Sequence, residues 1–126
     1  MHFPLSAWIT LATLLLYVWI VMKVGKARKT FSIHAPSVDG PPEFLRTLRV
    51  QANSVEQMVL FLPALWMCAL CLNDIAAAFG GVIWLIGRTM YAIGYYREAA
   101  KRGLGFALSS MAALGLLVAA AYGLLR

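Results

Sequence analysis

The feature that most constrains this chain is a stretch without charged residues near its start, from Leu5 to Met22. A helix that crosses the hydrocarbon core of a bilayer needs about 20 mostly apolar residues, and this stretch comes close to that length. The residues before it, Met1-His2-Phe3-Pro4, lack the basic region of a signal peptide, and no small-residue cleavage site follows. We therefore expect a transmembrane helix that the protein retains.

Three further apolar runs follow, and they set the fold class. They span Val59–Leu72, extended backwards by a helical pattern from about Phe44, then Ile75–Ile86, continuing to about Arg97, and finally Leu104–Leu125. Of the 126 residues, 62% are apolar and 13% are charged, against about 45–50% and about 25% in soluble domains. We predict an all-α integral membrane protein with a single domain, residues 1–126. Its four transmembrane helices should span about 5–27, 42–72, 74–102 and 104–125.

The basic residues predict how the bundle is oriented. They gather in or beside the first and third connections between helices: Lys23, Lys26, Arg28, Lys29, Arg46, Arg49, Arg97, Lys101 and Arg102. By the positive-inside rule these connections face the cytoplasm and both termini lie outside. We expect a bacterial inner membrane. The net charge of +6 then requires no nucleic acid, because a basic rim beside anionic lipid headgroups explains it.

Polar side chains interrupt two of the predicted helices close to that cytoplasmic face. Arg49, Asn53 and Glu56 are spaced i, i+4, i+7, which places them on one helix face. The next helix carries Arg88, Tyr91, Tyr95 and Arg102, and the last of these shares the face of Tyr91 if that helix continues unbroken. Polar groups inside a membrane span are costly and are therefore candidates for function.

Glu56 and Arg88 allow two interpretations. Counted inward from Arg49 and Arg97, they lie roughly 10 Å and roughly 13–14 Å deep at the helical rise per residue. An ion pair between Glu56 and Arg88 would remove two isolated charges from lipid, so a purely structural role is one expectation. The whole polar set exceeds what a single structural pair requires, and this favours a binding site.

The chemistry of the set suggests its ligand. Several arginines with an asparagine and tyrosine hydroxyls suit a small molecule that carries carboxylates, because the guanidinium fork matches a carboxylate. The neighbouring helix faces are apolar, so a second, lipophilic ligand could approach from the bilayer. Cys68 and Cys71 have no neighbouring charge that would activate a thiol, and we expect them to pack in the core. We expect no metal site and assign no role to His2 or His34.

Two segments resemble the signature of the MAPEG family, the membrane-associated proteins in eicosanoid and glutathione metabolism. The first runs from Gly40-Pro-Pro-Glu to Glu56 and contains the pattern Arg-x-x-x-Asn-x-x-Glu. The second, Gly87-Arg88-Thr89-Met90-Tyr91 to Arg97, is similar to the third helix of the family. The resemblance covers about residues 20–125 and is nearest the branch of leukotriene-C synthase and the microsomal glutathione transferases.

This resemblance implies a homotrimer that holds glutathione between neighbouring subunits at the cytoplasmic side. The family positions that contact glutathione correspond here to Arg28, Arg49, Gln51, Asn53, Glu56, Tyr91 and Tyr95. Arg102 falls where the branch has the catalytic arginine that stabilises the glutathione thiolate. Lys29 falls where a second arginine assists the lipid substrate, and a lysine there keeps the charge but loses the guanidinium fork. One departure is Gln57, which stands where the family usually has a tyrosine.

The expected function is therefore a membrane-embedded glutathione transferase. Glutathione would be its co-substrate and a lipophilic small molecule its second substrate, with peroxidase or isomerase chemistry available to the same thiol. One alternative is a lipid-binding scaffold of the same family without catalysis; Arg102 argues against it, because such members tend to lack the activating arginine. A second alternative is a small multidrug exporter, which would need an acidic residue in the first helix, and Leu5–Met22 has none.

Overall fold

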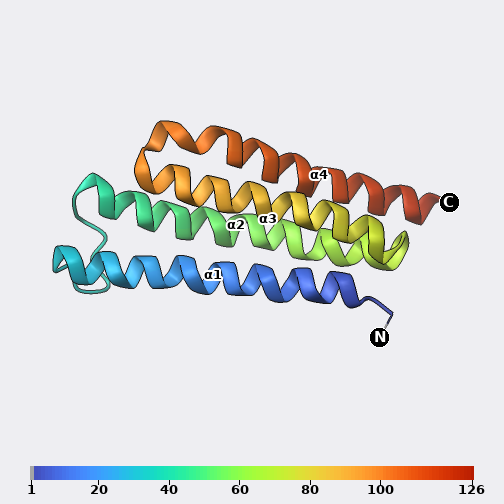
Figure 1. The fold of residues 1–126 in the computed structure, drawn as a ribbon, viewed down its shortest axis with the longest axis horizontal. Coiled ribbons are helices and arrows are strands. Elements are labelled where there is room, and N and C mark those ends of the chain that lie inside the picture. Colours follow the sequence, from blue (N-terminus) through green and yellow to red (C-terminus); the bar gives the residue numbers. More distant parts are fainter. Residues whose placement is uncertain (1) are drawn as a thin grey trace.

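Four long antiparallel helices form an elongated bundle in the computed structural model, which describes residues 2–126 (Figure 1). Met1, part of the expected domain, lies outside the described residues. The elements are α1 (Pro4–Phe31), α2 (Pro42–Cys71), α3 (Asp74–Arg97), a 3-10 turn η1 (Ala99–Arg102) and α4 (Gly103–Leu125). Each long helix is long and apolar enough to cross a membrane. The α1–α2 and α3–α4 connections lie at one end, and both termini lie at the other.

Local sequence explains where most helices begin and end. Prolines stand in the first turn of α1 and α2, where the missing N–H costs nothing. The side chain of Asn73 accepts a hydrogen bond from the backbone N–H of Ala76 at 2.7 Å and so caps α3. Helix α1 extends to Phe31, four residues beyond the expected end near residue 27, and stops where Ser32 adopts a left-handed conformation, φ 55°.

The third helix is shorter than the expected span 74–102. It ends at Arg97 because Glu98 is extended, φ −163° and ψ 131°, while its N–H still donates to the carbonyl of Gly94 at 3.0 Å. The chain then makes the η1 turn before α4 begins at Gly103. The expectation of one unbroken helix as far as Arg102 is therefore wrong, and the sequence Glu98-Ala99-Ala100 contains no residue that breaks a helix.

Asp74 fastens the start of α1 to the start of α3. Its carboxylate accepts hydrogen bonds from the backbone N–H groups of Leu5 and Ser6, both at 2.9 Å, and from the Ser6 hydroxyl at 2.6 Å. A carboxylate satisfies the free N–H groups of a helix N-terminus and complements its dipole. One side chain thereby caps α1 from a neighbouring helix.

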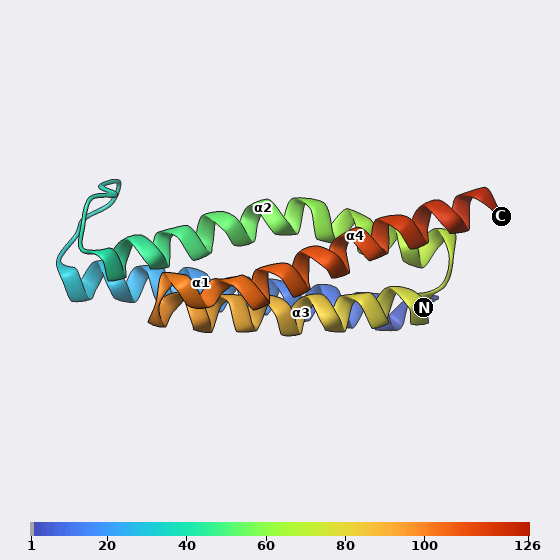
Figure 2. The ribbon, with the colours of Figure 1, turned by 90° about the horizontal axis from the view of Figure 1, so that it is seen from above.

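The interior is packed with aromatic and small side chains. The rings of Phe61 and Trp84 stack between α2 and α3, with centroids 3.9 Å apart. Helices α3 and α4 lie close together near their connection and diverge toward the C-terminus (Figure 2). A side-chain carbon at Gly87 would lie 2.7 Å from the backbone nitrogen of Ser109, and one at Gly105 would clash with the backbone of Tyr91. Small residues are typical of close helix contacts in membranes.

Large apolar side chains cover the outside of the bundle. Trp8, Val59, Phe79 and Met111 are each 70–72% exposed, and they come from four different helices. An apolar surface on every side of a helix bundle is what a lipid environment requires and what water would disfavour.

The close α3–α4 contact can be tested by adding one methyl group. We expect Gly105→Ala to lower the melting temperature of the detergent-purified protein by roughly 5 °C or more, because backbone cannot yield to the new carbon as a side chain could. The control is Gly115→Ala in the same helix, where nothing lies within 4 Å. Equal melting temperatures for the two variants would contradict the close contact.

Candidate functional site

A polar cavity of about 400 Å³ opens between α2, α3 and the start of α4, at the end of the bundle that carries the basic connections. It is lined by Arg49, Asn53, Tyr91, Tyr95, Arg102 and Phe106. Five of these six residues are candidates that the sequence had indicated. The cavity therefore brings together predicted residues from distant parts of the chain, with Arg49 and Arg102 separated by 53 positions.

Helices α2 and α3 each contribute two side chains one turn apart. Asn53 is buried, 8% exposed, whereas the side chain of Arg49 nearer the end of the bundle is 52% exposed. Tyr91 and Tyr95 are 2% and 8% exposed, and their rings meet edge to face with centroids 5.5 Å apart. The spacing of four residues explains why each pair shares a face.

Arg102 reaches the cavity from η1, although the helix that was expected to carry it has ended. Its Nη1 donates a hydrogen bond to the Tyr95 hydroxyl at 3.4 Å, and its guanidinium carbon lies 5.3 Å from the centre of that ring. Gly94 makes room for this turn, because a side-chain carbon there would lie 2.5 Å from the carbonyl oxygen of Lys101. The break at Glu98 thus folds Arg102 back over the tyrosines.

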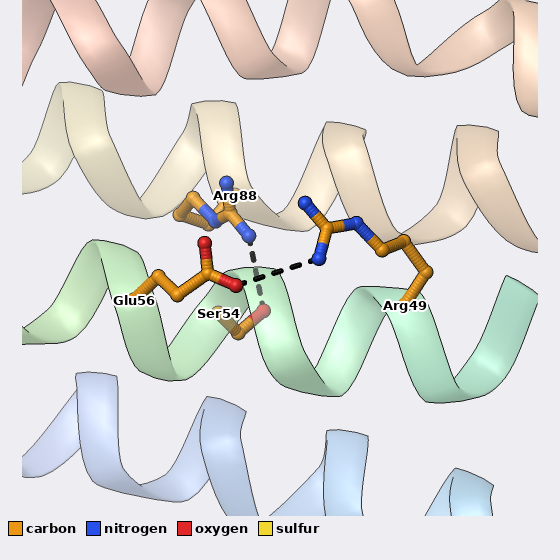
Figure 3. A network of polar contacts seen from close by, with 4 residues as sticks. All are labelled: Arg49, Ser54, Glu56 and Arg88. Carbon is orange, nitrogen blue, oxygen red and sulfur yellow. Dashed lines mark hydrogen bonds and ion pairs between the residues drawn. The ribbon is translucent and has the colours of Figure 1, made fainter. Parts of the chain in front are cut away.

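Glu56 forms an ion pair with Arg49, and the expected pair with Arg88 is wrong. Arg49 Nη1 lies 3.4 Å from Glu56 Oε1, and both side chains belong to α2 (Figure 3). The Glu56 side chain is 61% exposed, whereas Arg88 is 1% exposed. The two groups lie at similar depths along the bundle but differ in burial, and depth alone had suggested the pair.

Arg88 is instead held by Ser54, the buried neighbour of Asn53 on α2. Its Nη2 donates to Ser54 Oγ at 3.0 Å, and the guanidinium carbon lies 4.1 Å from the ring centre of Tyr91. Within residues 2–126 its Nε and Nη1 have no hydrogen-bond partner. Contact with an aromatic face offsets part of the cost of burying this cation, and Arg88 thereby supports a ring that lines the cavity.

Three other candidates lie away from the cavity of their own chain. Gln51 donates to the Tyr17 hydroxyl on α1 at 3.4 Å. Arg28 donates to the carbonyl of Ser37 at 2.8 Å and stacks over the Phe44 ring at 5.3 Å. Lys29 is exposed at the end of α1. Their expected contacts with glutathione and a lipid substrate stay predictions.

Phe106 is the lining residue that sequence reasoning missed. It lies in the first turn of α4, with its ring centroid 6.2 Å from that of Tyr91. No polar signal marks a phenylalanine in an apolar helix, so only its place four residues after Arg102 could have indicated it. It gives an otherwise polar cavity one apolar wall.

The cavity combines two guanidinium groups with amide and hydroxyl groups, and a carboxylate lies at its edge through the Arg49–Glu56 pair. Such a set can bind an anion through charge-assisted hydrogen bonds. Among the described residues no group of three His, Cys, Asp or Glu side chains could hold a metal ion, and Cys68 and Cys71 are free thiols.

Fold and site together define a class: a helical membrane protein with a polar, arginine-lined cavity near one end of its bundle. The model of the MAPEG family matches residues 6–122, and the chain belongs to this family of integral membrane proteins.

An uncharacterised protein of Synechocystis sp. is 43% identical over 119 residues, or 94% of this chain and 87% of that protein. Leukotriene C4 synthase of Rattus norvegicus is 43% identical over 122 residues, covering 96% and 81%. Microsomal glutathione S-transferase 2 of Bos taurus is 38% identical over 108 residues, covering 86% and 74%.

The support that Ser54 gives to Arg88 can be tested by a pair of variants. We expect Ser54→Ala to lower the free energy of unfolding by about 1–3 kcal/mol, because it leaves a buried cation with one partner fewer. Adding Arg88→Met should recover most of this loss, since an apolar side chain of similar length needs no hydrogen bond. Denaturant unfolding in detergent measures both, and a double variant less stable than Ser54→Ala would contradict this role.

Proposed function

We propose that this protein is a membrane-embedded glutathione transferase that activates the glutathione thiol for attack on a lipophilic electrophile. The observation that carries the proposal is one cavity lined by Arg49, Asn53, Tyr91, Tyr95 and Arg102. Relatives about 40% identical over most of their length are named leukotriene C4 synthase and microsomal glutathione S-transferase 2, and they support the same chemistry.

Glutathione matches the charges of the cavity. It is a small tripeptide that carries two carboxylates and one ammonium group at neutral pH. Arg49 with Asn53 and the tyrosine hydroxyls would bind carboxylate and amide groups, and Glu56 would bind the ammonium group. Arg49 and Glu56 pair with each other at 3.4 Å when no ligand is bound. Glutathione would break this exposed ion pair and make one contact with each of the two side chains.

Arg102 is the residue that we assign to thiol activation. A free thiol has a pKa of about 8.5, so only about 3% is ionised at pH 7. A guanidinium group within hydrogen-bonding distance favours the thiolate, which is the nucleophile. The thiolate sulfur then attacks the electrophilic atom of the second substrate, a thioether bond forms and the leaving group or opened ring takes up a proton. Reduction of a hydroperoxide by the same thiolate is a second reaction that this site would support.

A homotrimer would complete the site. Arg28 and Gln51 lie away from the cavity of their own chain, so their contacts with glutathione require a neighbouring subunit. Lys29, exposed at the end of α1, would then assist the lipophilic substrate as it arrives from the bilayer. The basic end of the bundle faces the cytoplasm in this arrangement, both termini lie outside, and the membrane is the inner membrane of a bacterium.

Arg102→Ala separates catalysis from binding. We expect the variant to bind glutathione with nearly unchanged affinity and to lose roughly thirtyfold in turnover at pH 7. This factor is the ratio between a fully ionised thiol and an unassisted thiol, of which about 3% is ionised. Its rate should rise with pH up to about 8.5, where the free thiol ionises, while the wild type stays nearly flat. Turnover with a model electrophile, measured from pH 6 to pH 9, checks both. Unchanged turnover would remove Arg102 from the mechanism, and glutathione binding without turnover in the wild type would favour a binding scaffold.

Arg49→Ala should act mainly on binding. We expect the Kd for glutathione to rise by roughly ten- to a hundredfold, as for the loss of one charge-assisted contact. Arg46→Ala is the matched control, because Arg46 lies one turn earlier on α2 and does not line this cavity. Calorimetric titration in detergent measures both. Equal affinities for the two variants would show that the cavity at Arg49 is not the glutathione site.

A further inference from the structure

A second hollow lies at the same end of the bundle, and it shares no lining residue with the polar cavity. It encloses about 420 Å³ between the end of α1, the start of α2 and the end of α3. Cations line it from all three helices: Lys23 and Lys26 from α1, Arg46 from α2 and Arg97 from α3. Three separate helices thus converge their positive charges on one space.

The charges in this hollow are not balanced by the protein. Glu43 is the one carboxylate that lines it. Within residues 2–126 the ion pairs are Arg49–Glu56 and Lys101–Glu98, so Glu43 makes direct contact with none of the four cations. Like charges that line one space repel one another, and an anion between them would relieve that repulsion.

Two polar atoms of the lining residues are buried without a partner. The Nε of Arg46 and the hydroxyl of Tyr96 are both inaccessible and have no hydrogen-bond partner in the described chain. Buried polar groups normally have a partner, and each exception calls for one. Both can donate a hydrogen bond to a phosphate oxygen once their side chains rotate, because neither atom is open to the hollow in this structure.

An apolar hollow adjoins the cationic one. It encloses about 270 Å³, is lined by Trp19 and Met22, and shares Lys23 and Lys26 with its neighbour. The Lys23 ammonium lies 5.4 Å from the Trp19 ring and 5.7 Å from the Tyr96 ring, at the junction of the two. Met22 is 66% exposed on the outside of the bundle. The polar space therefore adjoins an apolar one at the outer surface of α1.

We propose that the two hollows together bind one anionic phospholipid, with its phosphodiester headgroup among Lys23, Lys26, Arg46 and Arg97. Its glycerol backbone and the start of one acyl chain lie against Trp19 and Met22. A soluble phosphate would use only the first hollow. A lipid uses both and joins the ends of α1, α2 and α3 through one molecule.

Competition between lipids tests this site. The detergent-purified protein is exposed to equal amounts of phosphatidylglycerol and phosphatidylcholine with matched acyl chains, and retained lipid is counted by native mass spectrometry. We expect the wild type to retain phosphatidylglycerol selectively. The variant Lys23→Gln with Arg46→Gln, which keeps side-chain length, should lose roughly thirtyfold of this preference, about fivefold for each cation.

Lys101→Gln is the matched control, because Lys101 is a cation at the same end of the bundle but outside both hollows. It should keep the preference, and a glutathione titration of all variants confirms that they are folded. An equal loss in Lys101→Gln would indicate a diffuse basic rim and overturn the proposal. Displacement of the lipid by inorganic phosphate at millimolar concentration would assign the pocket to a soluble anion, and displacement by glutathione would assign it to the co-substrate. Either result would overturn the lipid site.

Discussion

A bilayer offers no water to a polar group, and this constraint shapes the whole molecule. Backbone groups must be satisfied within each helix, and polar side chains must be satisfied by other helices. The chain meets the second demand with few contacts: Asp74 caps α1 through Leu5 and Ser6, and Ser54 holds the buried Arg88. The other polar groups gather at the end of the bundle, where water is near. Charged groups near the end of a bundle cost less than charged groups at its centre, because they can reach water.

The close approach of α3 and α4 determines the geometry of the cavity. Gly87 and Gly105 let the two backbones touch, which sets Tyr91 on α3 near Phe106 on α4, with ring centroids 6.2 Å apart. Gly94 lets η1 fold back, and Arg102 arrives above Tyr95. The catalytic candidate is therefore positioned by backbone packing at glycines that do not line the cavity. This is a common way to hold a reactive group in place, because a backbone contact is stiffer than a side-chain contact.

The sequence predicted the membrane fold, the family and which faces carry the polar residues. The spacing of Arg49 and Asn53 placed this pair correctly on one face, because a helix repeats every 3.6 residues. The partner of Arg88 was predicted wrongly, because counting residues gives depth along a helix but not which side of it faces the neighbour. Ser54 and Glu56 are two residues apart and therefore point about 200° apart around α2. Only the packing of α2 against α3 determines that Ser54 faces Arg88. The break at Glu98 carried no local signal either, since it arises from the η1 turn packing on Gly94.

Two hollows at one end of the bundle divide the basic residues between them. Arg49 and Arg102 face the polar cavity, while Arg46 and Arg97 face the hollow beside α1. Arg46 and Arg49 are one turn apart on α2 and yet line different spaces. In our proposal, basic residues that first suggested a uniform rim, within a net charge of +6, are divided between a site for a soluble co-substrate and a site for a lipid.

The central claim is that the cavity at Arg102 binds glutathione and ionises its thiol. The most direct measurement is a titration of the detergent-purified protein with glutathione at neutral pH, following the ultraviolet absorbance of the thiolate. We expect a saturable thiolate signal, with about one thiolate for each occupied cavity. If glutathione binds, as shown separately by calorimetry, but no thiolate absorbance develops, the cavity does not activate the thiol. In that case the claim that this protein is a transferase of this kind is contradicted.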